Sequence, residues 1–147
     1  MVGIELRTAL APDPSSAAEA RRFVRSALAD WGASNLNEVA ALLVTELVTN
    51  AVLHTHSGPE VTARLAGPRL RVEVADDNPS PPVRQHYGPR AGTGRGMILV
   101  NELASAWGSE PAGRGKIVWF ELESGSLAHR LAPDPLRQFA PAHEASR

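Results

Sequence analysis

The strongest constraint on the fold is a long apolar stretch from about Leu36 to His54. Its apolar side chains have helical spacing but lie on almost every side of the helix: Val39, Leu42, Leu43, Val44, Leu47, Val48, Ala51 and Val52. A helix with this pattern lies inside a protein, because none of its faces suits water. Asn35 and Glu38 have the spacing of a capping box, which predicts where the helix begins. The rest of the chain must therefore cover this helix.

Shorter periodic segments before and after the apolar stretch predict the elements that could cover it. Val2 to Thr8 alternate in polarity, which predicts a short strand with one buried face. Asp13-Pro14 and a capping box at Ser16 and Glu19 precede a segment with helical spacing that ends at Gly32. Two further alternating runs flank Gly67-Pro68 and predict a hairpin: Val61, Ala63 and Leu65, then Leu70, Val72 and Val74.

The second half begins with a stretch too rich in proline and glycine for a regular element, from Asn78 to Thr93. Such long loops are usually functional lids or disordered segments. A third helix follows from Met97 to Ala104, and a closing hairpin runs from Trp107 to Leu122 with a turn at 111–115. We therefore predict an α+β fold, a two-layer α/β sandwich whose mixed, mainly antiparallel sheet is covered on one face by helices. Residues 1–123 form this domain, and 124–147 are expected to be a flexible tail.

Composition and charge narrow the functional classes. The 147 residues suffice for one domain with a sizeable core. The absence of cysteine excludes disulfides and thiolate metal sites, which fits a reducing compartment. No stretch suggests a membrane span or a signal peptide, so we expect a cytoplasmic protein without membrane contact. The 15 basic and 16 acidic residues are dispersed along the chain and predict no direct binding to nucleic acid.

The first candidate for chemistry is the pair Glu46 and Asn50, one turn apart on the same face of the apolar helix. A buried carboxylate needs a partner, solvent or a ligand-filled cavity. An acid and an amide oxygen at this spacing suit a Mg²⁺ ion that takes its other ligands from water and phosphate oxygens. The alternative is structural: Glu46 pairs with an arginine and Asn50 caps a neighbouring backbone.

The second candidate is Asp76. Leu70, Val72 and Val74 share one face of their strand, and Asp76 continues the same phase while Asp77 points away. An inward carboxylate at a strand end can accept a hydrogen bond from an N–H group of a ligand. The alternative is an Asx turn that ends the strand.

The third candidate is the sequence Gly92-Thr93-Gly94-Arg95-Gly96 at a helix start. Glycines let a backbone approach phosphates closely, and the free N–H groups and dipole of a helix N-terminus favour an anion. Arg95 could add a phosphate contact or could be a solvated surface residue.

Two further basic features suggest only structural roles. His54-x-His56 follows a helix end and favours capping or a surface position over metal binding. Lys116 is the only lysine of the chain and opens a strand, which we interpret as a hairpin charge.

Four segments in order resemble the GHKL (Bergerat-fold) ATP-binding family, specifically its small anti-sigma factor serine kinases: ELVTNAVLH at 46–54, VEVADDN at 72–78, GTGRGMILV at 92–100 and GKIVWFEL at 115–122. The resemblance implies that Asn50 holds a Mg²⁺ bridging the ATP phosphates. Glu46 matches the acid proposed to act as the base or orienter for the attacking hydroxyl. Asp76 matches the acid that accepts a hydrogen bond from the adenine amino group. Gly94 and Gly96 match the second glycine box over the phosphates, with 78–93 as the nucleotide lid.

The resemblance also implies a function and partners. Such kinases phosphorylate a serine of an anti-anti-sigma (STAS-type) protein, bind a sigma factor, and often pair into homodimers. The chain departs from the family at the first glycine box, D-x-G-x-G, where it has Asp76-x-Asn78-x-Ser80. Asn tolerates positive φ well, so we expect Asn78 to preserve the backbone path, whereas Ser80 does not replace a glycine. This departure favours an alternative, a non-catalytic module of the same fold that binds a partner with structural nucleotide or none. A histidine-kinase fragment ranks last, because no dimerising helical hairpin with a phosphoacceptor histidine precedes the domain.

Overall fold

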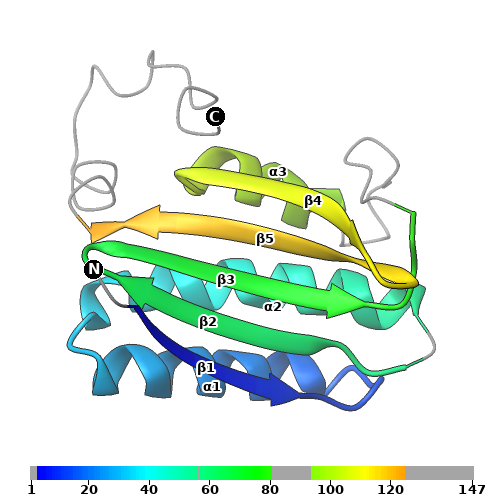
Figure 1. The fold of residues 1–147 in the computed structure, drawn as a ribbon, viewed down its shortest axis with the longest axis horizontal. Helices are drawn as coiled ribbons and strands as arrows, with labels where there is room; N and C mark the ends of the chain where they lie inside the picture. The colour runs from blue at the N-terminus through cyan, green and yellow to red at the C-terminus, as the bar shows by residue number, and fades with distance from the viewer. Residues whose placement is uncertain (1–2, 56, 81–93, 125–147) are drawn as a thin grey trace.

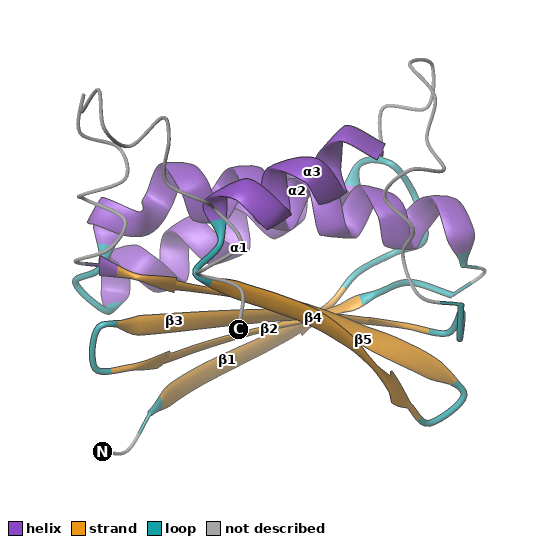
Figure 2. Cartoon of the chain, turned by 90° about the horizontal axis from the view of Figure 1, so that it is seen from above, coloured by secondary structure: helices purple, strands orange, loops and turns teal. Residues whose placement is uncertain are grey.

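The computed structural model describes residues 3–55, 57–80 and 94–124 (Figure 1). The elements follow the predicted order: β1 (Ile4–Ala9), α1 (Ser16–Asp30), the 3₁₀ helix η1 (Ser34–Leu36), α2 (Asn37–His54), β2 (Glu60–Ala66), β3 (Arg69–Asp76), α3 (Gly94–Leu103), β4 (Ala106–Ala112) and β5 (Gly115–Glu123). Figure 2 shows the sheet as one layer and the helices as a second layer on one of its faces. The predicted α+β two-layer architecture is confirmed.

The five strands lie in the order β1-β2-β3-β5-β4, and each neighbouring pair is antiparallel. The expectation of a mixed sheet is therefore wrong for the described strands. Both predicted hairpins are present, with turns at Gly67-Pro68 and Gly113-Arg114. Gly67 and Gly113 have φ of 61° and 56°, so each turn has positive φ at its first residue alone, as in type II′ turns.

Helix α2 lies in the core, but it is not covered on every side as its apolar pattern predicted, because Leu42 and Leu53 are 38% and 58% exposed. It packs against α1, α3 and the strands β3 and β5. The segment Ser34–His54 has a mean hydropathy of 1.4 and is long and apolar enough to count as a candidate membrane span, contrary to our expectation. More than half of it is buried within this domain, as in the core helix of a soluble protein.

Neither predicted capping box forms. Ser16 lies inside α1 and is buried, and its hydroxyl donates to the carbonyl of Ala11. Asp13 accepts hydrogen bonds from the backbone and the hydroxyl of Ser15, both at 2.8 Å, and these hold the pKa of the Asp13 carboxyl below its usual value. Helix α2 continues directly from η1, with Leu36 at its N-cap and no side-chain cap. Local turns therefore start both helices in place of capping boxes.

Strand β1 is less buried than its alternation predicted. Ile4 and Leu6 are on the side of the sheet that faces the helices, opposite Leu65 and Ala63, but remain 49% and 42% exposed. The reason is position, because β1 is the edge strand and packs mainly on β2. The prediction that one face of this strand is buried is therefore wrong.

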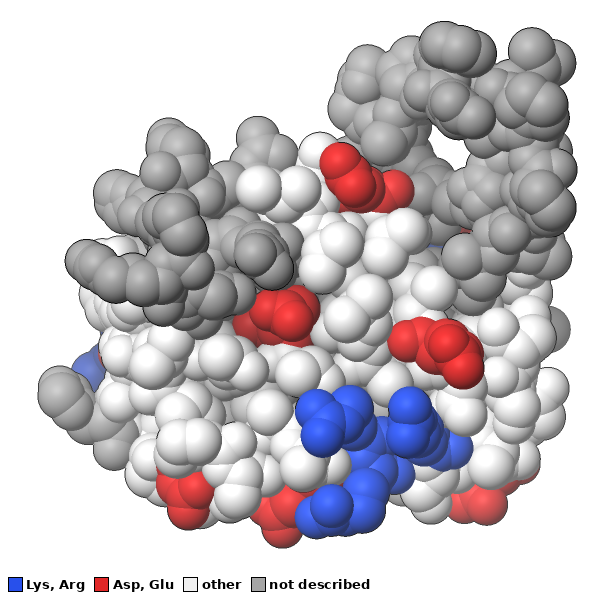
Figure 3. Space-filling model, turned by 180° about the vertical axis from the view of Figure 1, so that it is seen from behind, with Lys and Arg blue, Asp and Glu red and all other residues white. Residues whose placement is uncertain are grey.

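The two outer surfaces differ in how their charged side chains are arranged. The sheet face away from the helices is covered by ion pairs such as Arg64–Glu5 at 3.0 Å and Arg71–Glu121 at 2.9 Å, and Arg71 also stacks over Trp119. On the helix side, Figure 3 shows basic side chains gathered in one region, where α1 contributes Arg21, Arg22 and Arg25. The helix side also exposes the apolar side chains of Leu42, Leu53 and Ile98, while the buried core lies between the two layers.

Substitution of Gly115, at the start of β5, tests how closely this strand must approach β3. A Cβ at Gly115 would lie 1.8 Å from the carbonyl oxygen of Asp76, whereas a Cβ at Gly113 would have open space around it. We expect Gly115→Ala to lower the free energy of unfolding by about 3 kcal/mol. Gly113→Ala should lower it by about 1 kcal/mol, through its positive φ alone. Urea denaturation measures both, and equal losses would contradict the close approach.

Candidate functional site

Four segments meet at one end of the two layers: the end of α2, the end of β3, the start of α3 and the start of β5 (Figure 1). The side-chain amide of Asn78 joins two of them, because its Nδ2 donates to the carbonyl oxygen of His54 at 2.9 Å. Asp76 precedes Asn78 by two residues, and Asn50 precedes His54 by one helical turn. The chain thus brings the predicted residues of α2 and β3 to the same end of the domain.

Asp76 ends a column of apolar cross-strand pairs between β3 and β5. Leu70 and Leu122, Val72 and Phe120, and Val74 and Val118 oppose one another and are buried. Asp76 is the next residue in this phase, and its side chain is 2% exposed, so the predicted inward orientation is confirmed. The Asx turn also forms, because the N–H of Asn78 donates to Asp76 Oδ1 at 2.9 Å. Both alternatives for Asp76, the inward carboxylate and the Asx turn, are therefore present in the structure.

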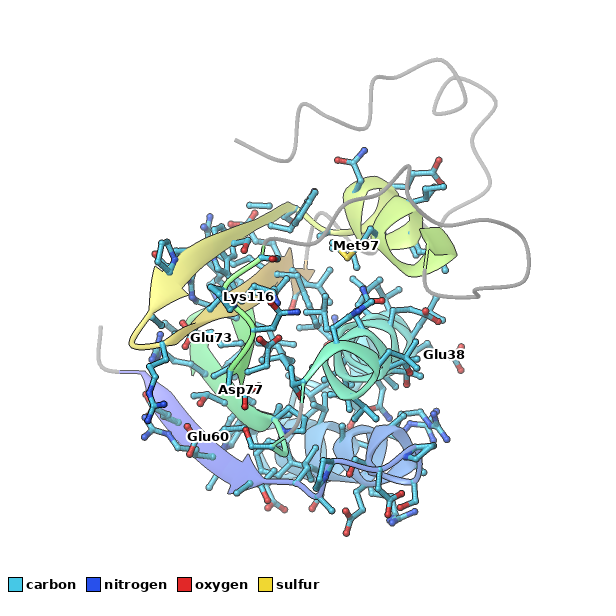
Figure 4. The ribbon with its side chains drawn as sticks, turned by 90° about the vertical axis from the view of Figure 1, so that its right-hand side faces the viewer. Glu38, Glu60, Glu73, Asp77, Met97 and Lys116 are labelled. Atoms are coloured by element: carbon cyan, nitrogen blue, oxygen red, sulfur yellow. The ribbon has the colours of Figure 1, made fainter. Side chains whose placement is uncertain are left out.

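Lys116 is the cross-strand partner of Asp76, and its interpretation as a hairpin charge is wrong. Its ammonium donates to Asp76 Oδ1 at 3.1 Å and to the carbonyl oxygen of Asn78 at 3.0 Å, and its side chain is 8% exposed. Figure 4 shows Lys116 on the side of β5 that faces the helices. Lys116 occupies the same alternating positions of β5 as Val118 and Phe120. This alternation in the sequence could have indicated that its side chain points inward.

Asn50 is buried, and neither Oδ1 nor Nδ2 has a hydrogen-bond partner among the described residues. The alternative in which Asn50 caps a neighbouring backbone is therefore wrong for that part of the chain. An unsatisfied buried amide is unfavourable, so its presence in the core helix needs an explanation such as a ligand. Glu46 is half-buried one turn earlier on the same face.

The oxygens of Asn50 and Glu46 fit a magnesium ion by their chemistry. Carboxylate and amide oxygens are hard ligands, and Mg²⁺ commonly binds through one or two protein groups together with water and phosphate. The described residues contain no group of three or more histidine or acidic side chains that could hold a metal. Such an ion would therefore depend on a ligand for the rest of its coordination shell.

Asn78 and Ser80 take a backbone path different from the one we expected. No residue other than glycine has positive φ in the described segments, so Asn78 does not use the left-handed region. Hydrogen bonds of its side chain fix the path of the backbone instead. Oδ1 accepts from the N–H of Ser80 at 2.9 Å, and Nδ2 donates to the carbonyl oxygen of His54. The chain thus leaves β3 through hydrogen bonds where the family pattern has glycines.

The glycine-rich segment lies partly outside the described residues. Gly94, Arg95 and Gly96 form the first turn of α3, where free N–H groups suit an anion, and the buried Met97 then anchors this helix in the core. Gly92 and Thr93 lie outside the described residues, as does the predicted lid from 81 onward. The roles predicted for these glycines and for Arg95 remain predictions.

The fold and this polar end define a two-layer domain suited to a nucleotide ligand. The family model for the histidine kinase-like ATPase domain matches residues 10–122, most of the chain, and the protein therefore belongs to this family. Membership supports the predicted GHKL-type resemblance and implies ATP binding, usually with Mg²⁺. The antiparallel sheet covered by helices is consistent with the Bergerat fold. A search of curated proteins finds no match.

The unsatisfied amide of Asn50 makes a prediction about stability. In the absence of ligand, Asn50→Leu should raise the free energy of unfolding by about 1 kcal/mol, because it removes two buried polar atoms that have no partner among the described residues. The control is Asn101→Leu on α3, since Asn101 Oδ1 accepts from Trp107 Nε1 at 3.0 Å. That substitution should lower stability by about 1 kcal/mol. A destabilised Asn50→Leu would indicate that the amide has a structural partner.

Proposed function

We propose that this protein is an ATP-binding anti-sigma factor-type serine/threonine kinase that acts in the cytoplasm. It phosphorylates a serine of an anti-anti-sigma (STAS-type) protein and also binds a sigma factor, as a monomer or a homodimer. The observation that carries the proposal is the buried amide of Asn50, which has no partner in the described chain and lies one turn from Glu46. Membership in the histidine kinase-like ATPase domain family supports it.

Asp76 receives the base of the nucleotide in this proposal. Its carboxylate faces the helix layer at the end of an apolar column, so a flat aromatic base could bury its faces there while its edge meets a charged acceptor. An ionised carboxylate only accepts hydrogen bonds, so it selects a donor such as the adenine amino group.

Asn50, Glu46 and the start of α3 act on the phosphates. A Mg²⁺ ion held there would neutralise charge on the transferring phosphoryl group and on the leaving ADP. Asn50 offers it an amide oxygen, and the N–H groups of Gly94 and its neighbours in α3 add a partial positive charge. Glu46 accepts the proton of the attacking serine hydroxyl as the serine oxygen bonds to the γ-phosphorus and the bond to ADP breaks. Positioning and charge neutralisation are sufficient for phosphoryl transfer of this kind.

Calorimetric titration with Mg-ATP tests the base site. The wild type should bind, and Asp76→Asn should weaken binding by about tenfold or more, because it replaces a charged acceptor with a neutral one. Asp77→Asn is the matched control, since Asp77 is adjacent but exposed and accepts from Ser57. This control should bind as the wild type does. Absence of wild-type binding at millimolar nucleotide would contradict the proposed ATP site.

Phosphoserine formation on the cognate anti-anti-sigma protein tests the catalytic role. Glu46→Gln should retain Mg-ATP binding but lower the rate of transfer about 100-fold, because glutamine cannot accept the proton. Glu38→Gln is the control, since Glu38 is exposed near the start of the same helix (Figure 4). Transfer that persists at the wild-type rate in Glu46→Gln would remove Glu46 from the mechanism.

A second candidate is a non-catalytic partner-binding module of the same fold. The observation that favours it is the altered first glycine box, where Asn78 is hydrogen-bonded to His54 and Ser80 at the end of β3. Nucleotide binding without any transfer to the cognate partner would support this candidate over the kinase.

A further inference from the structure

Lys116 has no role in the mechanism described above, although it lies at the proposed base site. We propose that Lys116 is a positioning residue that sets the selectivity of Asp76 for a base carrying an exocyclic amino group. This inference rests on the proposed ATP site and assigns Lys116 a role in recognition, beyond fold stability.

The hydrogen bonds around Asp76 are asymmetric. Oδ1 accepts both the ammonium of Lys116 at 3.1 Å and the N–H of Asn78 at 2.9 Å. Oδ2 accepts no bond from the part of the chain that the structure describes. Among the described residues, one carboxylate oxygen is therefore fixed by two donors, whereas the second has no donor and suits a group from outside.

The position of the pair argues against a purely structural role. Three apolar pairs precede it in the same column between β3 and β5, and a fourth would complete the core. A buried ion pair seldom stabilises a fold more than well-packed apolar side chains of similar size. A charged pair at the end of the column, where ligand residues gather, is therefore better explained by recognition.

The backbone next to Lys116 allows its close contact with Asp76. Gly115 leaves no room for a Cβ beside the Asp76 carbonyl, so β5 begins in direct contact with the end of β3. Lys116 then binds Asp76 and the carbonyl of Asn78 together. The ammonium thus fixes the carboxylate and the turn that follows it, which orients Oδ2 before any ligand arrives.

The test compares ATP with purine riboside triphosphate, which differs by the loss of the amino group alone. The wild type should prefer ATP about 100-fold, because a fixed charged acceptor penalises a ligand that cannot donate to it. Lys116→Met should reduce this preference to about tenfold or less, since the carboxylate is no longer held. Arg114→Met is the matched control, because it removes one positive charge two residues away at an exposed position, and it should keep the wild-type preference.

The ratio of the two affinities separates recognition from stability. A merely structural lysine would weaken both nucleotides equally, so an unchanged ratio in Lys116→Met would overturn the inference. Circular dichroism checks folding, and if Lys116→Met does not fold, Lys116→Gln replaces it with the same expected loss of preference. Wild-type protein that binds neither nucleotide would contradict the proposed ATP site itself. Wild-type protein that binds both equally would retain that site but overturn the role of Lys116.

Discussion

The ion pair between Asp76 and Lys116 organises the polar end of the domain. It closes the column of apolar side chains between β3 and β5, and the same ammonium holds the carbonyl of Asn78. Asn78 in turn holds the last turn of α2 through His54. The sheet and the core helix are thus joined by consecutive hydrogen bonds from Lys116 and Asn78. The positions of the other site residues depend on these bonds.

Both ends of the core helix carry buried polar atoms without partners among the described residues. Most of α2 makes apolar contacts with its neighbours, but Asn37 Oδ1 at its start and both amide atoms of Asn50 near its end accept or donate no hydrogen bond there. A fold selected for stability alone would fill the position of Asn50 with an apolar side chain. The domain therefore gives up some stability where the predicted ligand residues lie, which is common at functional sites.

The periodic segments allowed most of the fold to be predicted from the sequence. The core helix, both hairpins and the inward phase of Asp76 follow from local spacing, and the structure confirms them. Other features depend on distant parts of the chain. The partner of Lys116 lies forty residues earlier, and the exposure of Ile4 and Leu6 depends on which strand lies at the sheet edge. Local patterns also predicted two capping boxes that tertiary packing replaced, as the buried Ser16 shows. That the Asn50 amide has no partner within the described segments is visible only in the three-dimensional structure.

The distribution of basic groups has a chemical consequence. Apart from five histidines, all other basic side chains of the protein are arginines, whose guanidinium groups stay charged and do not react with common amine reagents. Its single lysine is enclosed between a carboxylate and a carbonyl. Apart from the chain terminus, acylating reagents have only this amine as a target. The rate at which it is acylated therefore measures how often the polar end of the domain opens to solvent.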